Sequence, residues 1–358
     1  MFEQVDTATV NSSDRFNEQR QIIKLRYEAL EASIKAKRAR DIAKALDISE
    51  AQWVAASCGP LKSIQLNGPA QQIFRNIKPL GPVMALTRND SCVHERHGQY
   101  LDIQADGPVG LVLGPDIDLR VFFSHWREVF AVEENGRRSL QFFDKEGQAV
   151  HKVYCTPQTD LARYHELVRA NARDTVWPQS EAIVQTVQPD EPNDPEGFRQ
   201  AWLTLTDTHD FFPMLTKFQV SRLGALEHAG RDLAQPVSRV ALQTVLESAS
   251  ASELPIMCFV SNRGMIQIYT GRVKNIVIRG PWLNVLDPAF NLHLNMDDVN
   301  GVWVVNKPTA DGWVTSLEAF NKYGELIVQF FGARKPSIPE LPQWRMLMKS
   351  LCAEPLRA

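Results

Sequence analysis

Length, composition and charge describe an ordinary folded chain and argue against nucleic acid and membrane as its main partners. The chain has 358 residues, of which 44% are hydrophobic and 23% charged, enough for two domains with a large core. The net charge is −3 and the pI about 6.3, so no overall basic field favours nucleic acid. No apolar run has the roughly 18 residues of a membrane-spanning helix, and no signal-peptide pattern is visible. The cysteines are odd in number and not closely paired, which favours a reducing cytoplasm.

The first part of the chain shows a helical pattern that ends in a basic run. Residues 1–13 are expected to form a loose polar tail. One long helix is expected from Asp14, because apolar residues recur at helical spacing over 23–34. The basic run that follows consists of Lys35, Lys37, Arg38 and Arg40. It is interpreted as a solvated helix face, with an anion or nucleic-acid contact as the alternative. Ser49 is then expected to cap a helix over 50–56.

Alternating apolar residues predict a series of strands from about Leu80. These strands are expected at 83–86, 91–100, 119–123, 128–133, 138–143 and 149–154. The turn at 144–147 joins the last two as a hairpin. A helix is expected at 161–169. The Pro-rich, acidic stretch after it has no apolar periodicity and is expected to be a linker.

A second series of elements follows the linker. Asp194 is expected to cap a helix with Pro195 at its first position, where the missing N–H costs nothing. That helix is expected to run out at 206–209, and Asp210 is expected to cap a further helix. Later strands are expected at 254–260, 265–269, 275–278, 291–294, 302–305, 314–320 and 326–331, with a last helix over 341–351.

The order of elements is the same twice, which indicates an internal duplication. Residues 142–150 align with 319–327, a shift of 177, and 118–121 align with 291–294, a shift of 173. The expected fold is therefore α+β, with two tandem halves that each form an antiparallel β-sheet with flanking helices. The predicted boundaries are 14–175 for the N-terminal repeat, 176–195 for the linker and 196–352 for the C-terminal repeat. Clefts between similar halves are favoured ligand sites.

Motifs of common enzyme classes are absent, and one histidine stands out by its setting. The sequence contains no P-loop, GxSxG elbow, HExxH or CxxCH. His94 and His97 lie three residues apart on a predicted strand, so they point to opposite faces and should not share a metal. His209 lies at the expected break between two helices, followed by Phe211 and Phe212. An imidazole beside aromatic rings suits a flat hydrophobic cofactor with a metal centre, while an ordinary helix-terminal histidine is the alternative.

Five segments in the same order resemble one protein family. They are Thr206–Leu215, Leu119–Phe123, Phe290–Leu294, Val304–Thr309 and Gln329–Arg334. Together they look like the bacterial cytoplasmic haemin-degrading and haem-trafficking proteins of the HemS/ChuS/PhuS type, and the resemblance covers nearly the whole chain. It implies two tandem α+β halves with haem (iron protoporphyrin IX) held in a cleft between them.

The resemblance also implies the residues of the site. His209 matches the proximal iron ligand, with His293 as the next candidate. Arg120 matches the distal arginine, the catalytic candidate, and Phe122 packs nearby. The groups that match those around the haem propionates are Lys307, Gln329 and Arg334. Arginine stays charged at any working pH, so Arg120 suits stabilisation of an anionic species beside the iron. Family members often carry tyrosine where this chain has Phe331, so one hydroxyl contact is lost.

The implied function is haem binding in haem uptake and iron acquisition, followed by haem transfer or oxidative degradation. Enzymatic activity is left open: a haem oxygenase-like reaction needs an outside electron donor, because no flavin or nicotinamide fingerprint is visible. One alternative is a non-enzymatic chaperone that delivers haem to a separate haem oxygenase. Another is a haem-responsive DNA-binding regulator, against which the acidic net charge argues. The expected partners are haem and either such an oxygenase or the cytoplasmic side of the haem importer. The expected location is the cytoplasm, without membrane insertion.

Overall fold

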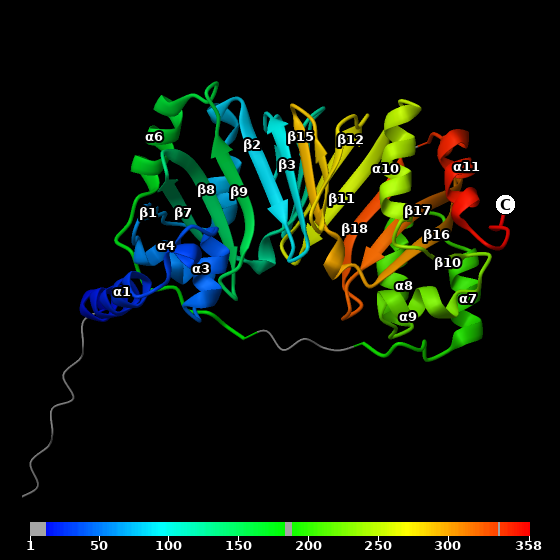
Figure 1. Cartoon of the computed structure of the whole chain (residues 1–358), viewed down its shortest axis with the longest axis horizontal. Helices are drawn as coiled ribbons and strands as arrows, with labels where there is room; N and C mark the ends of the chain where they lie inside the picture. The colour runs from blue at the N-terminus through cyan, green and yellow to red at the C-terminus, as the bar shows by residue number, and fades with distance from the viewer. Residues whose placement is uncertain (1–11, 183–187, 336) are drawn as a thin grey trace, which may run out of the picture. The chain divides into compact units, whose positions relative to one another are not determined.

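The computed structural model describes residues 12–182, 188–335 and 337–358, and it divides into two compact units (Figure 1). The first contains the described residues of Met1–Ala85, Gln99–Leu111 and Val121–Ile183, and the second those of Leu86–Gly98, Val112–Arg120 and Val184–Ala358. The second unit includes early segments because β3 (Cys92–Gly98) pairs with β15 (Phe290–Asn295). The predicted boundaries of the two repeats, 14–175 and 196–352, describe the sequence duplication and stay a prediction. In the predicted linker, 176–195, residues 183–187 lie outside the described residues.

Two nine-stranded antiparallel sheets are found in the described residues, as expected for an α+β fold. One has the order β1 (Leu61–Gln65), β7 (Trp126–Glu134), β8 (Arg137–Asp144), β9 (Ala149–Cys155), β2 (Val83–Arg88), β3, β15, β14 (Trp282–Leu286) and β13 (Ile276–Arg279). The other has the order β10 (Ala234–Val237), β16 (Gly301–Thr309), β17 (Gly312–Phe320), β18 (Leu326–Gly332), β11 (Ile256–Asn262), β12 (Met265–Gly271), β6 (Asp118–Phe122), β5 (Val109–Leu113) and β4 (Asp102–Gln104).

The helices of the described chain include α1 (Ser12–Glu28), α2 (Ala32–Lys35), α3 (Ala39–Ala45), α4 (Glu50–Ala56), α5 (Ala70–Arg75) and α6 (Leu161–Asn171). The later ones are α7 (Pro195–Leu203), α8 (Phe211–Lys217), α9 (Arg222–His228), α10 (Ala241–Ala251) and α11 (Pro342–Leu351). Short 3-10 turns include η3 (Thr208–Asp210) between α7 and α8. No helix in the described ranges is both long and apolar enough to cross a membrane.

The single long helix expected from Asp14 is wrong, because the chain breaks it into α1, α2 and α3. Tyr27 near the end of α1 packs on Trp53 of α4, with ring centroids 5.0 Å apart. The Lys35 ammonium then donates to the Glu28 carbonyl at 2.7 Å, which satisfies one of the free carbonyls at the end of α1. Tertiary packing therefore ends a helix that the apolar spacing alone would continue. Most of the predicted 1–13 tail lies outside the described residues.

The predicted hairpins and the caps at Ser49 and Asp194 are confirmed, whereas the cap predicted at Asp210 is wrong, because its side chain makes no hydrogen bond to the start of α8. The Ser49 hydroxyl accepts from the Gln52 amide in a reciprocal capping box, and the Asp194 carboxylate accepts from the Gly197 amide. The two hairpins also share one register: Gln141 pairs with Lys152 across β8 and β9, as Glu318 pairs with Gln329 across β17 and β18. Each residue of the second pair lies 177 residues after its counterpart in the first pair, the same shift as in the sequence alignment of the repeats. The duplication therefore extends to strand pairing.

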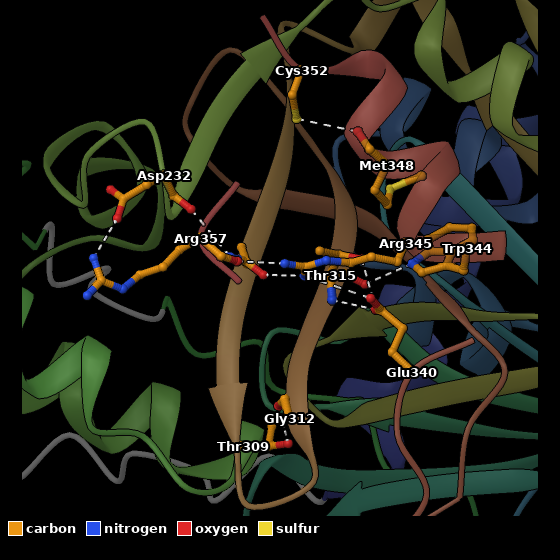
Figure 2. Close-up of polar contacts among 11 residues, drawn as sticks. Asp232, Thr309, Gly312, Thr315, Glu340, Trp344, Arg345, Met348, Cys352 and Arg357 are labelled. Carbon is orange, nitrogen blue, oxygen red and sulfur yellow. Dashed lines mark hydrogen bonds and ion pairs between the residues drawn. The ribbon is translucent and has the colours of Figure 1, made fainter. Parts of the chain in front are cut away.

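A polar network joins the C-terminal segment to β16 and α11 of the second unit (Figure 2). The Arg357 carbonyl accepts from the Arg345 guanidinium at 2.6 Å and from the Asn306 amide of β16 at 2.9 Å. Leu356 beside it is buried in the apolar core of this unit. Since Asn306 directly precedes Lys307, the end of the chain fixes the strand that carries one of the predicted site residues.

Candidate functional site

His209 lies in η3, at the break between helices that the sequence predicts. Asp207 caps this turn, because its Oδ1 accepts from the His209 backbone N–H at 2.8 Å. The same oxygen lies 2.7 Å from the His209 Nδ1. The Thr206 carbonyl accepts from the Ala310 amide of the β16–β17 turn at 2.9 Å, which ties the turn to the sheet. One carboxylate therefore fixes both the backbone and the ring of His209.

This arrangement leaves the second ring nitrogen of His209 available to a ligand. A carboxylate at Nδ1 holds that nitrogen protonated and leaves Nε2 as the lone-pair donor, the usual arrangement behind a metal-binding histidine. The His209 side chain is 85% exposed, so a ligand reaches it from solvent. The pKa of Asp207 is lowered, first by the hydrogen bond from the His209 amide, and an ionised carboxylate is the form that accepts from Nδ1.

The first two residues of α8, Phe211 and Phe212, follow His209 closely in sequence and differ in their exposure. Phe211 is only 2% exposed and packs edge-on against Trp202 of α7, with ring centroids 4.8 Å apart. Phe212 is 72% exposed. Phe211 therefore anchors the helix in the core formed by α7, α8 and α9, while Phe212, three residues after His209, offers an exposed apolar surface at the start of the same helix. An exposed aromatic ring of this kind has a ready use against a flat hydrophobic ligand.

Lys307 and Gln329 are brought together, and both contact a residue that the sequence reasoning missed. The Lys307 ammonium lies 3.3 Å from the Glu318 Oε1, and the Gln329 amide donates to the same oxygen at 3.0 Å. Glu318 is fully buried on β17 and also accepts two hydrogen bonds of 2.8 Å from the Arg222 guanidinium. An acidic residue inside an apolar strand was the available signal.

Arg334 lies near the turn that carries His209. Its guanidinium is 3.3 Å from the Asp311 carboxylate in the β16–β17 turn, next to Ala310 and its bond to Thr206. The charge of Arg334 also lowers the pKa of Asp207. The part of the site within the second unit therefore combines His209, its carboxylate and at least one cation at one end of β16–β18.

Arg120 and Phe122 lie on β6, where their side chains are partly buried. The Arg120 guanidinium pairs with the Asp118 carboxylate and donates to the Leu119 carbonyl at 3.1 Å. Arg120 belongs to the second compact unit and Phe122 to the first.

A cavity in the described residues is lined by none of the predicted site residues: its walls are Asn17, Arg20, Gln21, Lys24, Ser57, Cys58 and Gly59.

The donor set fits haem. It offers one imidazole nitrogen for an axial iron bond, an exposed ring for porphyrin contact, and cations that balance carboxylates. Two nine-stranded antiparallel sheets with helices, a hairpin register that recurs after 177 residues, and an exposed imidazole held by a carboxylate define a duplicated α+β protein with a candidate ligand site.

Comparisons with known proteins then identify the family. The family model described as "Haemin-degrading HemS.ChuX domain" matches residues 47–171 and 219–351. The "Hemin transport protein HemS" of Yersinia enterocolitica is 36% identical over 328 residues, which cover 89% of this chain and 94% of that protein. The chain belongs to the HemS/ChuX haemin-degrading family.

Solved structures agree with this assignment. The crystal structure of apo-PhuS, a haem-binding protein from Pseudomonas aeruginosa, superposes with a TM-score of 0.89 at 41% identity, over 94% of this chain and 100% of that one. The haem-degrading enzyme ChuS of Escherichia coli O157:H7 gives a TM-score of 0.86 at 36% identity, over 93% and 99% of the two chains. The relatives are thus haem-binding, haem-transport and haem-degrading proteins that share the whole fold.

Proposed function

We propose that this chain is a cytoplasmic haem-binding protein of haem uptake and iron acquisition, with His209 as the proximal iron ligand. The observation that carries the proposal is the exposed imidazole of His209, whose Nδ1 lies 2.7 Å from the Asp207 carboxylate. It occurs in a chain that shares a family and a fold with a haem-binding protein at 41% identity. Haem as the ligand explains both the metal-binding geometry and the exposed apolar ring of Phe212.

The residues divide the work of holding haem. His209 would hold the haem iron through Nε2, and Asp207 would fix the tautomer that makes this nitrogen basic. Phe212 covers part of the porphyrin face. Lys307, Gln329 and Arg334 balance the two carboxylates, because uncompensated carboxylates in a protein site are costly. Arg120 supplies a positive charge for the distal face, with Phe122 packing beside it. Bound haem supplies a redox-active iron.

The fate of the haem is transfer or oxidative degradation, and the relatives include both kinds of protein. PhuS is described as a haem-binding protein and ChuS as a haem oxygenase. Anaerobic and aerobic incubation of the haem-loaded protein with ascorbate separates them: steady conversion to a defined open-chain tetrapyrrole supports degradation, while intact haem that passes to an added haem oxygenase supports a chaperone. The partner in the second case is that oxygenase or the cytoplasmic face of the importer.

The regulatory alternative depends on the basic run at 35–40. In the structure Lys35 caps α1 and lies over the Tyr27 ring at 5.6 Å, so part of the run is engaged within the fold. A salt-dependent DNA shift that disappears when Lys35, Lys37, Arg38 and Arg40 are neutralised would support this role.

The first test is a haemin titration of wild type and His209→Ala, followed by the Soret band. A saturable band in wild type that shifts or weakens in the variant is expected. His293→Ala is the matched control, because His293 is the next candidate ligand and its Nδ1 is already 2.7 Å from the Asn284 side-chain oxygen. An unchanged band in His209→Ala together with a changed band in His293→Ala would move the iron bond to His293. No saturable band in wild type would end the haem assignment.

A further inference from the structure

A buried carboxylate organises the cationic side of the site. Glu318 is fully buried on β17 and lies in the middle of four polar side chains. Its Oε2 accepts from the Arg222 Nε at 2.8 Å, and its Oε1 accepts from the Arg222 Nη2 at 2.8 Å. The same Oε1 receives the Ser316 hydroxyl at 2.9 Å, the Gln329 amide at 3.0 Å and the Lys307 ammonium at 3.3 Å. We call these five residues the Glu318 cluster.

The Glu318 cluster carries a surplus positive charge. One carboxylate faces two cations, Arg222 and Lys307, and the Lys307 side chain is only 5% exposed. The ring of Phe211 takes up part of this surplus, since the Lys307 nitrogen lies 4.0 Å and the Arg222 guanidinium carbon 5.1 Å from its centroid. A buried cation without a full counter-charge is costly, so the cluster is best satisfied when a further anion comes close.

The Glu318 cluster is also linked mechanically to the proposed iron ligand. Phe211 lies two residues after His209 and is the first residue of α8. The Phe211 ring also packs edge-on against Trp202, whose ring N–H donates to the Asn306 carbonyl at 3.0 Å, directly before Lys307 in β16. The turn that carries His209 and the strand that carries Lys307 are therefore held by one packed set of side chains.

The first half of the chain offers an internal comparison. Gln141 takes the place of Glu318 in the register of its hairpin. There the buried acid is Glu50 on α4, which pairs with Lys152 of β9. One carboxylate faces one ammonium in that pair, whereas the Glu318 cluster has two cations. In the half that carries His209, the buried acid therefore lies on the hairpin strand itself and faces two cations.

We propose that Glu318 is a positioning residue: its carboxylate holds the Lys307 ammonium and the Gln329 amide in place for a carboxylate group of the tetrapyrrole. This inference rests on the proposed function. The ligand carboxylate neutralises the surplus charge of the cluster, so Glu318 governs carboxylate recognition and not the iron bond. Burial lowers the pKa of Lys307 to about 8, with Arg222 acting in the same direction and Glu318 opposing both. Removal of Glu318 therefore makes Lys307 easier to deprotonate as well as free to move.

The test compares haemin with haemin dimethyl ester, which keeps the iron and the ring but lacks the carboxylates. In wild type, haemin is expected to bind more tightly than the ester. In Glu318→Gln this preference should fall about tenfold, the size expected for loss of a hydrogen bond to a charged group, with ester affinity and Soret position unchanged. The haemin affinity of wild type should decline as pH rises through about 8, and this decline should move to lower pH in the variant.

Controls separate positioning from a loss of stability. Glu50→Gln removes an equally buried carboxylate from the other half and should leave the acid-to-ester preference and its pH profile as in wild type. Glu318→Asp keeps the charge and should keep the wild-type pH profile. Because Glu318→Gln leaves two cations buried, the double variant Glu318→Gln with Lys307→Met restores the net charge of the wild-type cluster, with Arg222 as its one cation, and should fold more readily than the single variant. It too should lose the preference.

Each result decides the inference. An unchanged acid-to-ester preference in Glu318→Gln and in its double variant with Lys307→Met overturns the positioning role while the haem site stands. A stronger preference in Glu318→Gln also overturns it, because it would show that Glu318 competes with the ligand carboxylate. Wild-type protein that binds neither haemin nor the ester overturns the proposed function itself.

Discussion

Asp207 is expected to control both the shape of the His209 turn and the strength of the iron bond. Its carboxylate caps η3 through the His209 amide and also meets the imidazole Nδ1. Loss of an N-terminal cap costs about 1 kcal/mol. Loss of the partner behind a metal-binding histidine weakens metal affinity about 10- to 100-fold. Because the Asp207 side chain is 58% exposed, solvent screens the pair, and the lower end of that range is expected.

The perturbation is Asp207→Ala, read by haemin titration and by urea unfolding without haemin. Affinity should fall about tenfold, which corresponds to about 1.4 kcal/mol. The free energy of unfolding should fall by about 1 kcal/mol. Asp207→Asn separates the two effects: its amide oxygen still accepts from the His209 N–H, so stability should recover while the weaker haemin binding persists.

Asp210 provides a matched control in the same turn. It precedes α8, but its side chain makes no capping hydrogen bond to that helix. Asp210→Ala therefore removes a neighbouring exposed carboxylate and should leave haemin affinity within a factor of about two. Equal affinities for wild type, Asp207→Ala and Asp207→Asn would refute the view that this carboxylate orients the iron ligand.

Three further predictions concern the exposed ring of Phe212, the buried ring of Trp202 and the buried carboxylate of Glu318. Phe212→Ala should leave the free energy of unfolding within about 0.5 kcal/mol, since the ring is 72% exposed, yet weaken haemin binding about tenfold through lost apolar contact. Tyr323 is 74% exposed in the β17–β18 turn, so Tyr323→Ala should change neither the free energy of unfolding nor the haemin affinity. Equal haemin affinities in Phe212→Ala and Tyr323→Ala would contradict a role of the Phe212 ring in haemin binding. Trp202→Phe should cost about 2–4 kcal/mol by urea unfolding, from a lost buried hydrogen bond and a void, and should also weaken haemin binding. Trp344→Phe loses an equivalent bond to the Thr315 carbonyl, so it should cost similar stability without the binding defect. For acid stability, burial raises the pKa of Glu318, but Arg222 and Lys307 outweigh it, so the pKa lies well below its ordinary value of 4.5. The ionised carboxylate therefore stabilises the fold above about pH 4.5, and this contribution is lost as pH falls further. Wild type should lose unfolding free energy more steeply below pH 4.5 than the double variant Glu318→Gln with Lys307→Met, and parallel curves would be incompatible with this account.

Local chemistry determines which features the sequence reveals. The break at His209 was predictable because the apolar period of the preceding helix ends there, and the Ser49 and Asp194 caps were predictable from residue type. The end of α1 at Glu28 was not, since it depends on packing between Tyr27 and Trp53. Strand β1 was missed because buried residues lie only at its two ends.

In the candidate site, too, local sequence patterns predict some features, and tertiary contacts determine the others. The position of His209 follows from sequence pattern, and the role of Asp207 two residues earlier had a signal in the Asp-x-His spacing, which is typical of a side-chain-capped turn. For the Glu318 cluster, the sequence signals only Glu318 itself, as an acid inside an apolar strand, and not its partners. Arg222 and Glu318 are 96 residues apart in sequence, and only strand pairing and the packing of α9 bring them within 2.8 Å. Contacts of that range are set by tertiary structure.

The duplication leads to a final prediction, that each chain binds one haemin. Helices α3 and α8 have equal length, and each is followed by a residue with positive φ and a capping serine. This correspondence places the exposed Lys37 where the second copy has His209, and a protonated lysine does not ligate iron. The first copy also has Ala39 at the position of Phe211.

A titration at protein concentrations well above the dissociation constant should therefore break at one haemin per chain. Lys37→His should still break at one, because the first copy has Ala39 at the position of the Phe211 anchor and Gln141 at the position of Glu318. A second equivalent with a His209-like Soret band in that variant would show that an exposed imidazole alone is sufficient. It would remove the reason for assigning the cluster around Glu318 a part in haem binding.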